Sequence, residues 1–301
     1  MSVNNSLSSV FNLAGFLELI GVSNPGRELI SVIKQYIQES GKNYEQWFGQ
    51  LQKDFELHRK DLAEQNMLEN LLDLLNRFKS PKLLREIYFV TGRAAAGKSY
   101  LSNKLSALIK QTEVLHGDGY LLPSRKERVL YEDEPFKKFH FSLFESHIRR
   151  LAFTDRPVPK LKYRDWDGEI IREGYLGKNL NSNIIVDSVF FGNLDQYQKL
   201  SSMSTASIFV AIEDVASLFN RIWRDLKFRN AASDDVTKII QNDYLRLQKQ
   251  HIPISWRYLE KSDVVLQCNI LDVKRNGYPF HYSYSLYKRN RVINSTAISS
   301  E

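Results

Sequence analysis

The clearest indication of fold in this 301-residue chain is the segment Gly92-Arg93-Ala94-Ala95-Ala96-Gly97-Lys98-Ser99. It fits the pattern G-x-x-x-x-G-K-[ST] at every fixed position, and in that pattern successive backbone N–H groups surround the phosphates of a nucleotide. The glycines allow a tight turn that residues with a Cβ would obstruct. Lys98 can reach the β- and γ-phosphates, and Ser99 can offer its hydroxyl to Mg²⁺. We therefore expect the segment from Gly92 to Tyr100 to bind ATP or another nucleoside triphosphate.

The flanking residues supply the setting that such a loop requires. Before it, Ile87-Tyr88-Phe89-Val90 is a short apolar run of β-forming residues. After it, apolar side chains recur at helical spacing along one face, at Leu101, Leu105, Leu108 and Ile109. The sequence therefore predicts a strand, the loop and a helix in succession, and the helix adds the positive end of its dipole to the phosphate site.

Short β-type runs and helical patterns alternate along the rest of the chain. The strand-like runs are 114–116, 184–186, 207–210 and 264–266, and the helical patterns are 98–110, 214–229 and 234–250. Buried strands that alternate with helices form a mostly parallel sheet covered on both faces. We expect an α/β fold, the three-layer α/β/α architecture of P-loop NTPases.

The N-terminal part has a different pattern. Residues from about 8 to 80 are expected to be helical throughout, because apolar side chains recur at helical spacing around positions 29–37, 47–55 and 67–78. Ser80-Pro81 marks a boundary, so the sequence predicts a helical region over residues 1–82 and a nucleotide-binding domain over residues 83–301. A structural appendage is the first interpretation of the helical region, and a partner-binding or substrate-capping role is the alternative.

Composition and charge exclude several classes of protein. Hydrophobic residues make up 43% of the chain, which suits an ordinary globular protein. The first 80 residues hold 8 Lys and Arg against 10 Asp and Glu, and the remainder holds 34 against 25, so the basic excess lies with the phosphate loop and favours an anionic partner. The single cysteine, Cys268, excludes an intramolecular disulfide and a cysteine-cluster metal site. No signal peptide or membrane-spanning run is evident, and we expect a cytoplasmic protein.

Two later segments carry a resemblance to a known family. His116-Gly117-Asp118-Gly119-Tyr120 follows the second strand-like run, and a helical pattern from Leu218 to Arg229 follows the run Val210-Ala211-Ile212-Glu213-Asp214. With the phosphate loop, these segments resemble the uridine kinase family and its relatives, the phosphoribulokinases and bacterial-type pantothenate kinases, over roughly residues 85–270. Residues before about 80 match nothing in that pattern.

The resemblance implies roles for individual residues. Asp118 corresponds to a general base that accepts the proton of an acceptor hydroxyl, and Lys98 and Arg224 complete the catalytic set. Asp187 stands where the family has Glu, and it is expected to bind Mg²⁺ with Ser99, acting through a water because its side chain is shorter. Arg221, Arg224 and Arg229 correspond to an arginine helix and lid over the phosphates.

The acceptor region matches the family only loosely. Arg164 separates Tyr163 from Asp165, and Trp166 stands where the family varies. The residues expected to bind the acceptor are Tyr120, Tyr163, Asp165, Trp166 and Arg172. For Tyr163 and Trp166, packing of an inserted hairpin is the alternative. A nucleoside is the acceptor that the family suggests most directly, with pantothenate-like compounds, glycerate and sugars left open.

The sequence thus favours a Mg²⁺-dependent kinase of a small hydroxyl compound. Two alternatives stay open: a kinase of nucleic-acid ends, and a nucleotide-binding regulatory module without transferase activity. The basic, aromatic C-terminal stretch from Tyr282 to Arg291 is expected to form an edge strand with a solvated face, and nucleic-acid binding is its alternative. Nothing in the sequence indicates an oligomeric state.

Overall fold

The computed structural model describes residues 27–78, 80, 82–122, 135–164, 168–189, 194–228, 257–273 and 280–290. Its helices are α3 (Arg27–Asp54), α4 (Glu64–Leu75), α5 (Lys98–Leu108), α7 (Phe141–Phe153), α8 (Leu194–Ser201) and α9 (Asp214–Phe228), with the 3₁₀ turns η1 (Gly117–Tyr120) and η2 (Pro135–Lys138). The strands are β1 (Phe55–Leu62), β2 (Ile87–Gly92), β3 (Thr112–His116), β4 (Val158–Tyr163), β5 (Ile170–Leu176), β6 (Asn183–Ser188), β7 (Ala206–Ile212), β8 (Val264–Val273) and β9 (Phe280–Arg289). Among these helices, none has both the length and the apolar character that crossing a bilayer requires.

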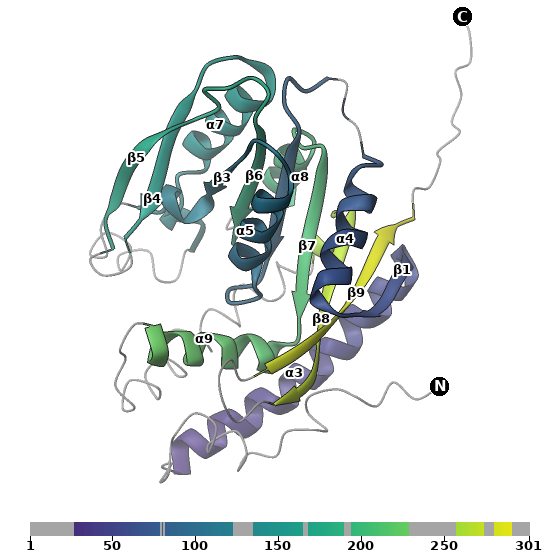
Figure 1. The fold of residues 1–301 in the computed structure, drawn as a ribbon. Helices are drawn as coiled ribbons and strands as arrows, with labels where there is room; N and C mark the ends of the chain where they lie inside the picture. Colours follow the sequence, from purple (N-terminus) through teal and green to yellow (C-terminus); the bar gives the residue numbers. More distant parts are fainter. Residues whose placement is uncertain are drawn as a thin grey trace, which may run out of the picture.

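Seven strands form one mostly parallel sheet, in the order β1-β9-β8-β7-β2-β6-β3 (Figure 1). The five strands from β8 to β3 run parallel, and β9 and β1 extend the sheet with antiparallel pairings. Strand β2, which leads into the phosphate loop, lies between β6 and β7. The α/β architecture expected from the alternating pattern is confirmed.

Both faces of the sheet are covered by helices because the central strands are apolar on both sides. All residues of β2 and of β7 are buried. Val90 and Ile208 pack into a cluster with α4, α5 and α9, whereas Phe89 and Phe209 pack into a second cluster with α7, α8 and the last turns of α3. Figure 1 shows α4 and α5 in front of the sheet and α3 behind it.

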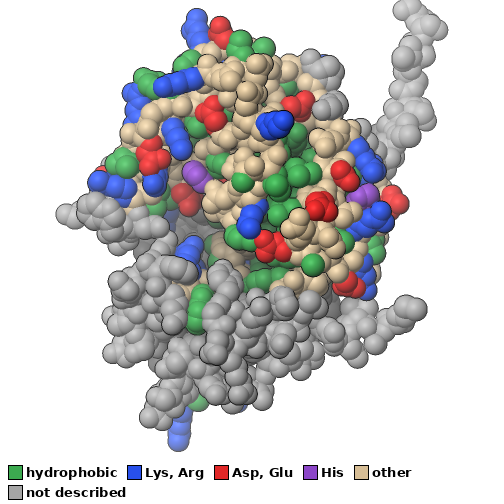
Figure 2. Space-filling view, in the orientation of Figure 1, with side chains coloured by type: hydrophobic (Ala, Val, Ile, Leu, Met, Phe, Trp, Pro, Cys, Tyr) green, Lys and Arg blue, Asp and Glu red, His purple; other side chains and the backbone are tan. Residues whose placement is uncertain are grey.

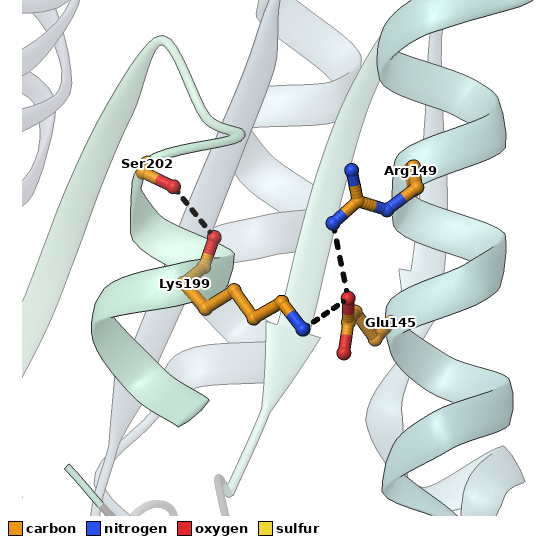
Figure 3. A network of polar contacts seen from close by, with 4 residues as sticks. All are labelled: Glu145, Arg149, Lys199 and Ser202. Carbon is orange, nitrogen blue, oxygen red and sulfur yellow. Dashed lines mark hydrogen bonds and ion pairs between the residues drawn. The ribbon is translucent and has the colours of Figure 1, made fainter. Parts of the chain in front are cut away.

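A polar network joins α7 and α8 on the second face (Figure 3). Lys199 Nζ of α8 lies 2.8 Å from Glu145 Oε1 of α7, and Arg149 Nη2, one turn further along α7, lies 3.1 Å from the same oxygen. These two donors hold the pKa of Glu145 below its ordinary value, and Lys199 has the larger effect. Such pairs contribute at most about 1 kcal/mol, so the apolar cluster beneath them holds the two helices together.

The N-terminal region departs from the expected pattern in two ways. Helix α3 is one continuous helix of 28 residues, where the sequence suggested two separate runs. The expectation of helix through Phe55–Leu62 was wrong, because these residues form β1 and pair with β9. Phe55 continues the helical spacing of Trp47 and Leu51, but the otherwise unpaired edge of β9 offers backbone partners that outweigh a weak local preference.

Helix α4 packs on the same core as the central strand. Met67, Leu71 and Leu74 are buried in the cluster that contains Tyr88 and Val90 of β2. The division of the chain at residue 82/83 stays a prediction. Strand β1 and helix α4 precede this boundary, but they pack on the sheet formed by the residues after it. Strand β9 was expected at an edge, and this is corrected: it lies between β8 and β1, with Tyr287 only 7% exposed.

Candidate active site

The carboxyl ends of four parallel strands meet beside β2. In the sheet register, Asp187 of β6 pairs with Val90 of β2 and with His116 of β3, and Gly92 pairs with Val210 of β7. The segments that leave these strands therefore begin at the same edge of the sheet. In open α/β sheets, ligands bind at this edge, where the strand order changes direction.

The phosphate loop, residues 92–99, turns between β2 and α5 as its pattern predicts. Gly92 has φ 144°, and a Cβ there would collide with the carbonyl oxygen of Val210, so only glycine lets β2 approach β7 this closely. Gly97 has φ 91° and precedes the first residue of α5. The first amides of α5 have no acceptor within the helix, and they are free to bind an anion.

The ammonium of Lys98 lies inside this turn. Its side chain is 5% exposed, and Nζ donates a hydrogen bond of 2.6 Å to the carbonyl of Arg93. Burial lowers the pKa of Lys98, while the nearby carboxylates of Asp187 and Asp118 raise it. The charge of Arg224 lowers it further. Lys98 therefore lies among three other charged groups of the expected site.

Asp187 and Ser99 lie together, as the expected magnesium site requires. Burial raises the pKa of Asp187, but a hydrogen bond from His116, the charge of Lys98 and a hydrogen bond from Ser99 hold it below its ordinary value. His116 Nδ1 lies 3.3 Å from Asp187 Oδ2. In the described part of the chain, no three His, Cys, Asp or Glu residues gather as a metal cluster. One ionised carboxylate and one hydroxyl suit Mg²⁺, which commonly takes its other ligands from water and phosphate.

Asp118 lies in η1, directly after β3, with its side chain exposed to solvent. The protein atoms around Asp118 replace part of its hydration and so raise its pKa, and the charge of Asp187 adds to the rise, whereas Lys98, His116 and Arg224 oppose it. The segment is tightly enclosed: a Cβ on Gly119 would lie 2.6 Å from the carbonyl oxygen of Leu161 in β4. Asp118 is thus a solvent-accessible carboxyl within a crowded part of the protein.

The structure places Tyr120 in the core. Its side chain is 1% exposed, its hydroxyl is hydrogen-bonded to His147 Nδ1 at 2.8 Å, and its ring lies edge-on to Phe144. A side chain this deeply buried has little surface to offer an acceptor. We therefore assign Tyr120 to holding η1, and with it Asp118, against α7.

The β4–β5 hairpin carries the other residues expected to bind the acceptor. Tyr163 is half-buried near the end of β4, and the exposed guanidinium of Arg172 stacks over the ring of Tyr175 at 4.0 Å. Asp165 and Trp166 lie outside the described residues. The hairpin also brings Glu173, which the sequence did not single out, within electrostatic range of His116. The pKa of Glu173 is lowered, mainly by the hydrogen bond from Lys162 and to a smaller extent by the charge of His116.

Helix α9 brings one of the three expected arginines, Arg224, within electrostatic range of the site. Arg221 and Arg224 are half-buried, and the charge of Arg224 acts on both Lys98 and Asp118. Arg229 lies outside the described residues. The helical pattern from Leu218 onward therefore gave the correct element, and its arginine at position 224 faces the phosphate loop.

The structure has a glycine-bounded loop between a central parallel strand and a helix, and that helix begins with a lysine and a serine. The chain has the P-loop NTPase fold. Solved structures with a similar fold include a kinase provisionally assigned to a fructose transport system from Silicibacter sp. TM1040, with 20% identity, coverage of 65% of this chain and 93% of that one, and a TM-score of 0.49. Phosphoribulokinase from Rhodobacter spheroides has 14% identity, with coverage of 71% and 83% and a TM-score of 0.48. D-glycerate 3-kinase from Cryptococcus neoformans has 14% identity, with coverage of 72% and 98% and a TM-score of 0.48.

At these identities, and with TM-scores below 0.5, the likenesses say nothing about the activity of this chain. No protein-family model matches the chain, and no curated protein matches its sequence. The substrate therefore has to be argued from the residues around the P-loop.

Sequence reasoning missed the residues that hold the P-loop from outside. Arg93 and Asp214 form a buried ion pair, with side chains 4% and 2% exposed. Ser217 Oγ donates to the carbonyl of Ala94 at 2.6 Å, and Asn220 Nδ2 donates to that of Ala95 at 3.2 Å. These contacts join residues more than 120 positions apart, so no local sequence pattern could predict them. They hold the carbonyls outward, and the amides are left to face the ligand.

Proposed function

We propose that the protein is a Mg²⁺-dependent kinase that transfers the γ-phosphate of ATP, or of a related nucleoside triphosphate, to the hydroxyl of a small molecule. One observation carries the proposal: Lys98, Asp118, Asp187 and Arg224 come from four different elements and interact electrostatically at the P-loop. Phosphoryl transfer needs mainly positioning and charge stabilisation, and these groups supply both.

The donor would be held by the loop and the start of α5. Backbone amides between Gly92 and Ser99 bind the phosphates, and Lys98 exchanges its bond to the Arg93 carbonyl for phosphate oxygens. Ser99 and the ionised Asp187 would hold Mg²⁺. Bound there, the ion would supply positive charge that neutralises the phosphates.

Asp118 would receive the proton of the acceptor hydroxyl. Its raised pKa makes it a better base than an ordinary aspartate, since a base works best with a pKa closer to the working pH. Its carboxyl is accessible to solvent and hence to an acceptor. Arg224, whose charge reaches both Asp118 and Lys98, would stabilise negative charge on the transferring phosphoryl group.

The acceptor would lie beside Asp118 with the β4–β5 hairpin as a neighbour, because β4 packs directly on the Asp118 segment. We favour a nucleoside, as the resemblance to uridine kinases suggests, with Tyr163 and Arg172 as contacts. Figure 2 shows acidic and basic side chains intermingled on the described part of the face in view. A track for a polynucleotide would instead gather Lys and Arg, so this face favours a small acceptor.

The test is transfer of labelled γ-phosphate to a panel of nucleosides, pantothenate, glycerate, sugars and a 5′-hydroxyl oligonucleotide. We expect transfer to one small compound, its loss in Lys98→Ala, and no change in Lys104→Ala. Lys104 is the matched control because it lies on the same helix but pairs with Glu64 of α4. Transfer to the oligonucleotide alone would replace the proposal with a nucleic-acid kinase. Tight ATP binding with no transfer to any acceptor would point to a regulatory module.

A further inference from the structure

The outer side of the P-loop is connected to strand β9 of the sheet by two hydrogen bonds. Asn220 of α9 donates from Nδ2 to the carbonyl of Ala95, and its Oδ1 accepts a 2.8 Å bond from the hydroxyl of Tyr282 in β9. Asn220 is 8% exposed, so both bonds lie largely away from water. The amide therefore has one partner on each side, and these partners fix which way it points.

The residue that Asn220 holds has a disfavoured backbone. Ala95 has φ 58°, in the left-handed region, where a side chain with a Cβ crowds its own carbonyl. An alanine adopts this conformation only where the surroundings enforce it. The bond from Asn220 is made to the carbonyl of Ala95 itself, and it acts on the strained peptide directly.

Helix α9 serves the donor site twice. Three residues of α9, each about one helical turn after the last, contact the loop. Asp214 pairs with Arg93, Ser217 bonds the carbonyl of Ala94, and Asn220 bonds the carbonyl of Ala95. The same helix carries Arg224, whose charge acts on Lys98. A shift of α9 would move the loop and the arginine together.

We propose that Tyr282 is a positioning residue of the donor site: through Asn220 it holds the Ala95 peptide in its left-handed conformation, so that the loop amides face the phosphates before the nucleotide arrives. Preorganisation of this kind strengthens binding by removing the cost of ordering the loop. The inference rests on the proposed function, because it assumes that the loop binds a nucleoside triphosphate.

The test compares two identical substitutions on one strand. Tyr282→Phe removes only the hydroxyl that bonds Asn220, whereas Tyr287→Phe removes a hydroxyl that bonds Gln267 Oε1 at 3.0 Å, away from the loop. We expect Tyr282→Phe to weaken MgATP binding about fivefold in titration calorimetry, the worth of one hydrogen bond. We expect Tyr287→Phe to bind MgATP as the wild type does. In the nucleotide-free proteins, amide hydrogen exchange in the peptide 92–99 should be faster in Tyr282→Phe only.

A double-mutant cycle tests the route through Asn220. If Tyr282 acts only by orienting that amide, adding Tyr282→Phe to Asn220→Ala leaves MgATP affinity where Asn220→Ala alone puts it. Additive losses would overturn the inference, as would equal MgATP affinity and equal loop exchange in Tyr282→Phe and Tyr287→Phe. In both cases the wild type still binds MgATP and the proposed function stands. Failure of the wild-type protein to bind MgATP would overturn the proposed function and this inference together.

Discussion

Replacing Gly92 by alanine tests the geometry on which the P-loop depends. The new Cβ would meet the carbonyl oxygen of Val210 far inside an ordinary contact distance of 3.4–4 Å, and the carbonyl carbon and the amide nitrogen of Val210 at 3.3 Å. These are backbone atoms of the neighbouring paired strand, so no side chain can rotate away. Either β2 separates from β7, or the backbone leaves its φ of 144°.

The cost has two parts. A Cβ in a left-handed or otherwise disfavoured region costs about 1–2 kcal/mol, and overpacking against a fixed neighbour costs about 1–3 kcal/mol. Together they should lower the free energy of unfolding by about 2–5 kcal/mol, a large share of the roughly 5–15 kcal/mol that proteins possess. Thermal unfolding should show a midpoint lowered by roughly 3–8 °C.

A matched control separates the two parts. Gly97→Ala also forces an alanine into positive φ, at 91°, but its Cβ meets nothing within 4 Å. We expect it to lose only about 1–2 kcal/mol. If Gly92→Ala were no less stable than Gly97→Ala, the close approach of β2 to β7 at the start of the loop would be wrong.

Two further substitutions test the base and the core. Asp118→Asn should lower kcat by about 10²–10⁴-fold with little change in ATP affinity. It should also raise the melting temperature at pH 7. Folding raises the pKa of Asp118, so its ionised carboxylate destabilises the folded state at this pH, and asparagine carries no such charge. In the wild type, kcat/KM should fall as pH falls through this raised pKa, on the alkaline side of an ordinary aspartate; a profile without such a limb, or a stable variant with full turnover, would remove Asp118 from its role. Arg85→Met should cost about 3 kcal/mol in urea unfolding, because the buried guanidinium donates to the carbonyls of Leu151, Thr154 and Gly177 at 2.7–2.9 Å; an unchanged midpoint would show that water replaces all three bonds.

The sequence predicted those parts of the fold that depend on residues close together in the chain. The loop from Gly92 to Ser99 has fixed residue types at fixed spacing, because each position has a steric or chemical task. The strand before it and the helix after it follow from apolar runs and helical periodicity. Asp118 and Asp187 could be located in the fold because each comes at or just after the end of a strand.

What escaped prediction depends on contacts between distant segments. Phe55–Leu62 fits a helical spacing locally, and only the exposed backbone of β9 makes it a strand. Tyr120 has the side chain of a binding residue, but its place between Phe144 and His147 is decided by tertiary packing. Asn220 and Tyr282 lie 62 positions apart, and no pattern in the sequence links them.

The proposed function requires the loop amides and Lys98 to hold a triphosphate, and the affinity of Lys98→Ala for MgATP measures whether they do. Hydrogen bonds from a charged group contribute about 1.5–3 kcal/mol, so the variant should bind MgATP about 10–150-fold more weakly than the wild type. Its melting temperature should change little, because Lys98 is buried at a cost in hydration that alanine does not incur. A folded Lys98→Ala protein that binds MgATP as tightly as the wild type would show that Lys98 does not hold the triphosphate.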